Sequence, residues 1–144
     1  MTFSHEILGG SLVMIYYDRF YELKPLLFQE LQNILGATKI YEDYVPNNNL
    51  NKLPLVVYNC DDLLVNRAIE HAVSVTFTLT VAIFATVKSD IERICKLLVD
   101  TLDASVVEDD QGVGLAEVFF ASQTEELTDN NIHCATLSFN VTIL

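Results

Sequence analysis

Apolar and polar residues alternate most regularly along residues 73 to 87. Valine, phenylalanine, leucine, isoleucine and alanine fill the odd positions, and mainly serine and threonine fill the even ones. A period of two with β-branched residues on both faces predicts a β-strand. A strand of this length spans roughly 50 Å, well above the usual length. We therefore expect it to bend at a bulge, or to project from its domain with backbone groups that a second subunit could pair with.

A helical period of three and four marks a segment near the start of the chain. Its apolar stripe consists of Phe20, Leu23, Leu27, Leu31 and Ile34. Gly36 follows as a good C′ residue, and Pro25 should kink the helix or start it. Either Asp18 or Lys24 could be the cap, and the pattern could also extend back towards Ser11.

A second helix is predicted directly after the long strand. Ser89 and Glu92 have the spacing of a capping box, in which each side chain accepts a hydrogen bond from a backbone N–H at the helix start. The pattern ends near Asp103. The expected buried stripe consists of Ile91, Ile94, Leu98 and Leu102, with Cys95 beside them.

Shorter strands complete the prediction. Residues 38–44 form one strand, and a loop rich in proline and asparagine follows at residues 45–54. The continuous apolar run at residues 55–58 is typical of a strand buried on both faces, and the polar residues 59–62 should end it.

Two strands end the chain, at residues 115–122 and 135–143, with a polar loop at residues 124–131 between them. The elements predict a single α+β domain with an antiparallel or mixed sheet of about four to five strands. We expect two main helices packed on one face of that sheet. Residues 1–17 form an N-terminal arm or helix extension ahead of the domain at 18–144.

Composition narrows the function. The chain has 144 residues, of which 51% are apolar and only 19% charged. Part of the surface is therefore expected to be covered by another protein. A sheet whose solvent-exposed face carries Thr, Ser and Asn would give a similar composition. The formal charge of −12 disfavours binding to nucleic acid and to anionic membranes.

Targeting and redox signals are few. The three cysteines are odd in number and none forms a C-x-x-C pair, so we expect reduced thiols in a cytoplasm. The N-terminus lacks a basic signal region, and the apolar run at residues 12–17 is too short to cross a bilayer. The sequence therefore predicts a soluble protein made in the cytoplasm.

Candidate chemistry is sparse. Asp61 and Asp62 follow a buried strand, which suits either a catalytic site or a solvated turn, and we favour the turn. His133 and Cys134 are adjacent in a strand and should point to opposite faces. We predict no catalytic, cofactor or metal residues, and hence no enzyme.

The layout resembles the tail-terminator, or tail-completion, proteins of long-tailed bacteriophages. The features that carry the resemblance run in order over nearly the whole chain. They are a helix ending in Leu35-Gly36, the short strand 39–42, the Leu-Pro-Leu-Val-Val-Tyr element 53–58, the Asp61-Asp62 pair, the long strand, the helix from Ser89 and the terminal hairpin.

The resemblance implies a structural protein of the virion tail or neck, assembled in the host cytoplasm. Its partners would be copies of itself in a hexameric ring, the tail tube protein and the head–tail connector. DNA would pass through as cargo, with no cofactor and no membrane. The subunit-interface candidates are Ser74, Thr76, Thr78, Thr80 and Phe84. The candidates for the acidic lumen are Asp61, Asp62, Glu108, Asp109, Asp110, Glu125 and Glu126. The candidates for the partner loop are Asn47, Asn48, Asn49 and Lys52.

Three alternatives stay open. The chain could form another ring of the same junction, such as a neck, head-completion or tail-tube subunit. In a different class, it could be a small ligand-binding or hydrolytic α+β domain with Asp61 and either His71 or His133 in its site. The third is a dimeric regulator, which light scattering would distinguish from a hexamer.

Overall fold

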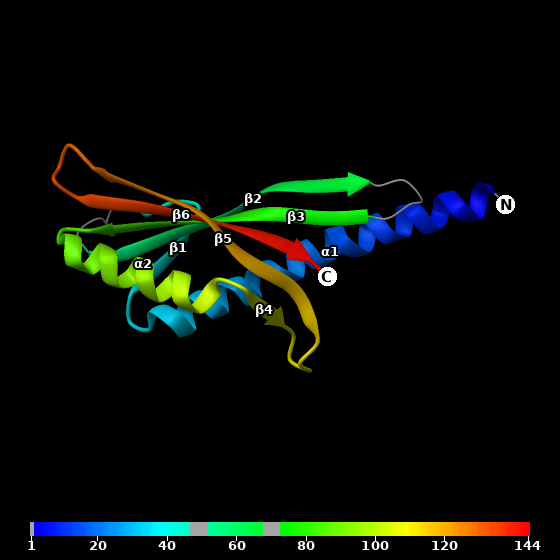
Figure 1. Cartoon of the computed structure of the whole chain (residues 1–144), viewed down its shortest axis with the longest axis horizontal. Helices are drawn as coiled ribbons and strands as arrows, with labels where there is room; N and C mark the ends of the chain where they lie inside the picture. Colours follow the sequence, from blue (N-terminus) through cyan, green and yellow to red (C-terminus); the bar gives the residue numbers. More distant parts are fainter. Residues whose placement is uncertain (1, 47–51, 68–72) are drawn as a thin grey trace.

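The computed structural model describes residues 2–46, 52–67 and 73–144, with side chains from residue 13 onward. Two helices and six strands make up the described chain (Figure 1). In chain order they are α1 (Thr2–Leu35), β1 (Lys39–Glu42), β2 (Leu55–Arg67), β3 (Val73–Ala85), α2 (Lys88–Leu102), β4 (Ser105–Glu108), β5 (Gly114–Leu127) and β6 (His133–Ile143).

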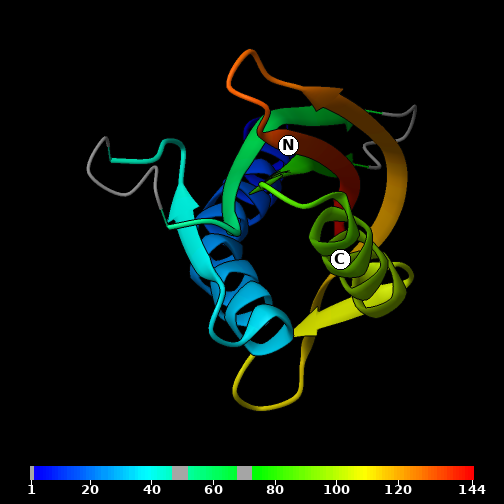
Figure 2. The ribbon, with the colours of Figure 1, turned by 90° about the vertical axis from the view of Figure 1, so that its left-hand side faces the viewer.

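The strands form one mixed sheet in the order β1-β2-β3-β6-β5-β4. Its neighbours pair antiparallel except for β1 and β2, which run parallel. The α+β prediction is confirmed, but the sheet has six strands rather than four to five. Viewed from one end in Figure 2, the sheet curls around the two helices. Both helices therefore lie on its concave face.

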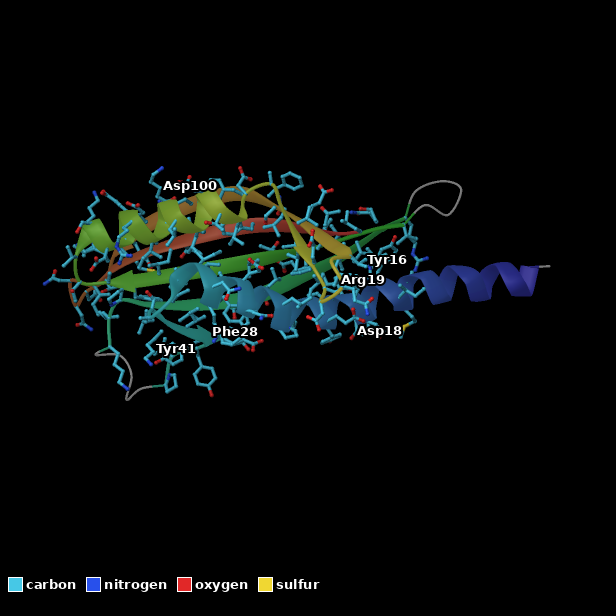
Figure 3. All side chains as sticks on the ribbon, turned by 90° about the horizontal axis from the view of Figure 1, so that it is seen from below. Tyr16, Asp18, Arg19, Phe28, Tyr41 and Asp100 are labelled. Carbon is cyan, nitrogen blue, oxygen red and sulfur yellow. The ribbon has the colours of Figure 1, made fainter. Side chains whose placement is uncertain are left out.

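The α1 helix is longer than its apolar stripe predicted. It runs without interruption from Thr2 to Leu35, through Pro25, so neither Asp18 nor Lys24 is a cap. In Figure 3, Tyr16, Asp18 and Arg19 lie where the helix leaves the sheet, and α1 continues well beyond them. The predicted stripe faces the core from Phe20 to Leu31, with Ile34 only partly buried. Gly36 ends the helix at φ +59°, as expected of a C′ glycine.

The predicted stripe of α2 is confirmed, and all its members are buried together with Cys95. The predicted capping box is wrong. The N-cap is Val87, which makes no side-chain cap bond, and Ser89 already lies inside the helix. The backbone carbonyl of Val87 accepts a hydrogen bond from the Asp90 N–H at 3.1 Å, so the first turn is closed by the backbone.

The predicted long strand, β3, is shorter than expected and is not at an edge of the sheet. It ends at Ala85 and occupies the middle of the sheet, between β2 and β6. Its odd residues from Val75 to Ala85 are buried against the helices. β3 therefore has no free edge, and the idea that it projects with unpaired backbone groups is wrong.

Other strands extend further than their sequence signals. β2 continues to Arg67: residues 59–61, which were expected to end it, pair in register with β3, and a bulge follows between Asp61 and Leu64. β5 continues to Leu127, through the first half of the predicted loop, with a bulge after Phe120. The edge strand β4 was not predicted at all. By contrast, the buried run at the start of β2 and the alternation of β6 are confirmed.

None of the described helices combines the length and apolar character needed to span a membrane.

Candidate assembly interface

The convex face of the sheet carries neutral, mostly small polar side chains. All five predicted interface residues come together here, because the even residues of β3 point away from the helices. Ser74 is exposed, and Thr76, Thr78, Thr80 and Phe84 are partly exposed. In register beside them on β6 lie Thr136, Ser138, Asn140 and Thr142. No helix covers this face in the described part of the chain.

Charge on this face is confined to its sides. Asp61 on β2 lies beside Thr78, and Glu117 on β5 lies beside Thr142. The central strands contribute no charged residue to it. Phe119, which lies opposite Asn140, leaves 43% of its side chain exposed. A broad neutral surface with an exposed aromatic residue is suited to contact with protein.

Two stretches of strand edge are open within the described residues. β1 pairs only with residues 55–58 of β2, and β4 pairs only with residues 114–118 of β5. Beyond these pairings, the ends of β2 and β5 have a sheet neighbour on one side only. Sequence reasoning missed both edges because it ended the two strands too early. The end of β5 had no period-two signal, because residues 123–127 read Gln-Thr-Glu-Glu-Leu and are all exposed.

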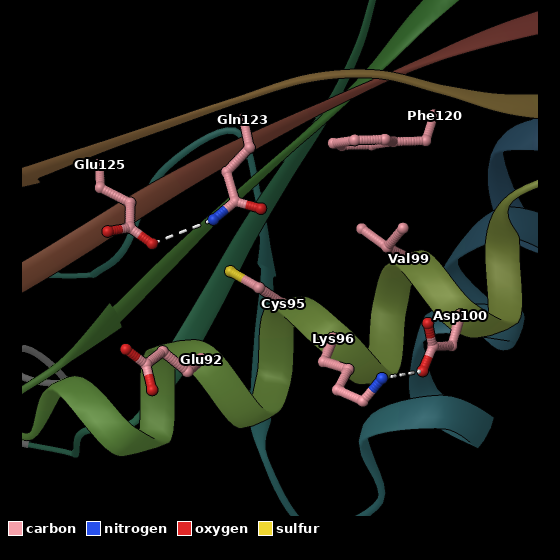
Figure 4. A pocket seen from close by; sticks show the side chains of 8 residues that line it. All are labelled: Glu92, Cys95, Lys96, Val99, Asp100, Phe120, Gln123 and Glu125. Carbon is pink, nitrogen blue, oxygen red and sulfur yellow. Dashed lines mark hydrogen bonds and ion pairs between the residues drawn. The ribbon is translucent and has the colours of Figure 1, made fainter.

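A groove runs beside the open end of β5 (Figure 4), with a volume of about 330 Å³. Cys95 and Val99 of α2 and Phe120 of β5 provide its apolar surface. Glu92 of α2 and Glu125 of β5 point towards it from opposite sides. The remaining lining residues are Lys96, Asp100 and Gln123. Lys96 and Asp100 form an ion pair at 3.0 Å, and the Gln123 amide donates a hydrogen bond to Glu125 at 3.0 Å.

The predicted lumen acids lie in three separate places on one subunit. Asp61 and Asp62 are at the bulge of β2, and residues 108–110 are at the β4–β5 turn. Glu125 and Glu126 are at the other end of β5, on opposite faces of the strand. In the turn, the Asp109 carboxylate accepts hydrogen bonds from the N–H groups of Gln111 and Val113, both at 2.9 Å. Asp109 therefore also has a structural role.

The predicted partner loop is only partly visible. Asn47, Asn48 and Asn49 lie outside the described residues, and Lys52 is exposed. Lys52 lines an open depression of about 420 Å³ together with Lys39 and Pro54.

The groups named for the ligand-binding alternative do not converge. Asp61 is in register with Thr78 and His133 with Ala85, at different positions along β3, and His71 lies outside the described residues. No potential metal-binding group of three or more His, Cys, Asp or Glu residues occurs among the residues searched, which are those described. Burial raises the pKa of the Cys60 thiol to about 12 and that of Cys95 to about 11, so both are protonated and weakly nucleophilic near neutral pH.

The sequence matches no protein-family model and no curated protein. Among solved structures, the chain is similar to one from the virion of a native gene transfer agent particle. The two share 13% sequence identity and superpose with a TM-score of 0.59, over 78% of this chain and 83% of the other. This likeness shows a shared fold.

Proposed function

We propose that this chain is a structural virion protein whose copies form a ring at the head-proximal end of a phage-type tail tube. The ring ends tube polymerisation and offers a surface to the head–tail connector. The observation that carries the proposal is the fold shared with a chain of a gene transfer agent virion, over most of both chains. The order of elements that resembles tail terminators supports the same role. In this role the chain does no bond chemistry and assembles in the host cytoplasm.

The surfaces suit a subunit that contacts protein on several sides. The convex face with Thr76 and Thr78 meets a neighbouring copy, and the loop with Asn47, Asn48, Asn49 and Lys52 meets the tube or the connector. Some of the acidic residues at 61–62, 108–110 and 125–126 line or rim the lumen. There they repel the phosphate backbone, so DNA slides through without being held.

Tail tubes provide the deciding experiment. The full chain, added to purified tubes of the same virion, should bind one tube end and stop further addition of tube protein, as seen by electron microscopy and by tube length. A neck, head-completion or tail-tube subunit would instead leave growth unchanged or join the tube along its length. Binding of DNA by the assembled ring in a gel-shift experiment would contradict the proposed lumen.

A further inference from the structure

The two open strand ends lie at opposite ends of the molecule. In Figure 1, β2 runs towards the end from which α1 projects, and the β5–β6 hairpin lies at the other end. The two open edges also belong to opposite sides of the sheet, because β2 and β5 are each next to an outermost strand. An elongated subunit with one open edge at each end is suited to repeated head-to-tail contact.

Charge complements this geometry on the concave face. At the end of β2, Arg67 is exposed and shares the face of its partner Val73, which packs against the core. At the end of β5, Glu125 is opposite buried Ala135 and so lies on the same concave face, beside Glu92. A cation therefore stands at one end and an acidic groove with an apolar surface at the other. An arginine suits such a groove because its stem packs on apolar groups while its guanidinium binds carboxylates.

The strand directions fix how the two ends can meet. Each step from β2 through β3 and β6 to β5 is antiparallel, so β5 runs antiparallel to β2 within one copy. If a neighbouring copy continues the sheet in the same orientation, its β2 also runs antiparallel to β5 of the first copy. The antiparallel register that places Arg67 opposite Glu125 also places Val65 opposite Leu127. Both of these apolar side chains are exposed, Val65 by 36% and Leu127 by 58%.

We propose that copies of this chain join head to tail, with residues 65–67 of β2 in one copy pairing antiparallel with residues 125–127 of β5 in the next. Arg67 then enters the groove beside Glu92 and Glu125, and Val65 packs on Leu127. This contact rests on the proposed function, since it names the joint by which the ring forms. A heterologous contact of this kind closes into a ring when the rotation between copies is right. The projecting half of α1 leaves from the same end as β2 and therefore points towards the same neighbour.

The remainder of the open β2 edge is protected against indiscriminate pairing. The bulge between Asp61 and Leu64 interrupts its ladder, and Asp62 adopts a left-handed conformation with φ 58°. Bulges and charged side chains are common devices that keep an edge strand from adding to other chains. The regular stretch beyond the bulge covers only residues 64–67, which limits the contact at this end to a short pairing.

A charge exchange tests the joint. Arg67→Glu and Glu125→Arg should each weaken association of the full chain by about tenfold or more, because each places like charges together. The two changes combined should restore association to within a few-fold of the unchanged chain, as measured by sedimentation velocity. Glu30→Arg is the control, because it makes the same charge change at an exposed position of α1 that belongs to neither strand end. Unaltered circular dichroism would show that all variants fold.

The outcomes separate this joint from the ring itself. If the unchanged chain assembles, alone or on tail tubes, while Arg67→Glu behaves like the Glu30→Arg control, the joint is wrong and the ring stands. The joint is also wrong if the combined exchange is no better than the single changes. If the unchanged chain assembles under neither condition, both the ring and the joint are wrong.

Discussion

Gly36 is the residue on which the end of α1 depends. Its backbone adopts φ +59°, and its N–H donates a hydrogen bond to the Gln32 carbonyl at 2.9 Å. A Cβ added there would meet no atom within 4 Å, so any cost of a side chain comes from the backbone alone. The turn that follows leads directly into β1.

Gly36→Ala should therefore lower the free energy of unfolding by about 1–2 kcal/mol, the usual cost of a left-handed alanine. Urea denaturation of the purified chain measures this loss. Gly36→Asn is the control and should cost less, because asparagine tolerates the left-handed region. Equal stability of the alanine variant and the unchanged chain would show that the turn imposes no such constraint.

Two groups whose pKa is raised by burial make the stability of the fold depend on pH in the alkaline range. Burial raises the pKa of Cys60 from 9.0 to about 12 and that of Tyr58 from 10.0 to about 12. The unfolded chain releases these protons at lower pH than the folded chain does. Their contribution to stability is therefore complete below pH 9 and is lost progressively as the pH rises towards 12.

The urea midpoint should accordingly fall between pH 8 and pH 10.5. Cys60→Ala removes one of the groups and should make the fall less steep. A midpoint that is constant over this range, or a slope unchanged in the variant, would contradict the linkage.

At the scale of single residues, sequence reasoning succeeds where the chemistry is local. The glycine stop at Gly36 and the buried stripe of α2 depend on nearest neighbours along one helix, so they could be predicted. Ser89 has the right chemistry for a cap but the wrong position, because the helix begins one residue before it. The role of Arg67 depends on a strand end that only the paired sheet reveals.

The α1 helix is buried along one part of its length and exposed along the other. From Phe20 onward its stripe is buried, whereas Met14, Ile15 and Tyr17 near the exit point are exposed. The Tyr17 and Tyr21 rings meet edge to face at 5.2 Å, which forms an exposed aromatic surface. No charged residue occurs between Glu6 and Asp18. An uncharged helix that projects from its domain is suited to contact with another protein.

Deletion of residues 2–12 should leave the melting temperature within about 2 °C of the unchanged chain, because the segment projects beyond the sheet. The same deletion should weaken association in sedimentation velocity. Deletion of residues 2–23 is the contrasting variant, since it removes Phe20 and Leu23 from the core and should destabilise the fold. A large loss of stability in the shorter deletion would instead place this segment within the folded core.

At the scale of elements, it was easier to predict whether a segment is a helix or a strand than to predict where it begins and ends. Periodicity identified both helices and the strands β3 and β6, whose side chains alternate between a buried and an open face. It ended β2 at Asp61 and Asp62, because a bulge that keeps polar residues in a strand has no local signature. β4 is four residues long and pairs at an edge, too short for any period to appear.

The whole molecule carries a formal charge of −12, and the proposed assembly must overcome repulsion between copies. Two such charges about 30 Å apart repel by roughly 20 kcal/mol in water without salt, as an upper bound. At physiological ionic strength, screening over about 8 Å reduces this to less than about 1 kcal/mol. An exposed ion pair such as that proposed for Arg67 contributes about 0–1 kcal/mol, so at low salt the repulsion prevails.

Added NaCl should therefore strengthen association, with a higher assembled fraction at 0.3 M than at 0.02 M in sedimentation velocity. The same dependence should appear in the Glu30→Arg control, shifted to lower salt because the variant carries less negative charge. Weaker association at higher salt would show that local ion pairs, rather than the overall charge, govern assembly.

The strand at residues 133–143, β6, is central to the sheet. It lies between β3 and β5, so the two halves of the sheet in the described chain pair only through it. A chain that lacked these residues would expose the inner edges of β3 and β5 together with their apolar faces. The sheet can therefore close only after β6 has been synthesised. Truncation within β6 would leave two unjoined half-sheets that are prone to aggregate.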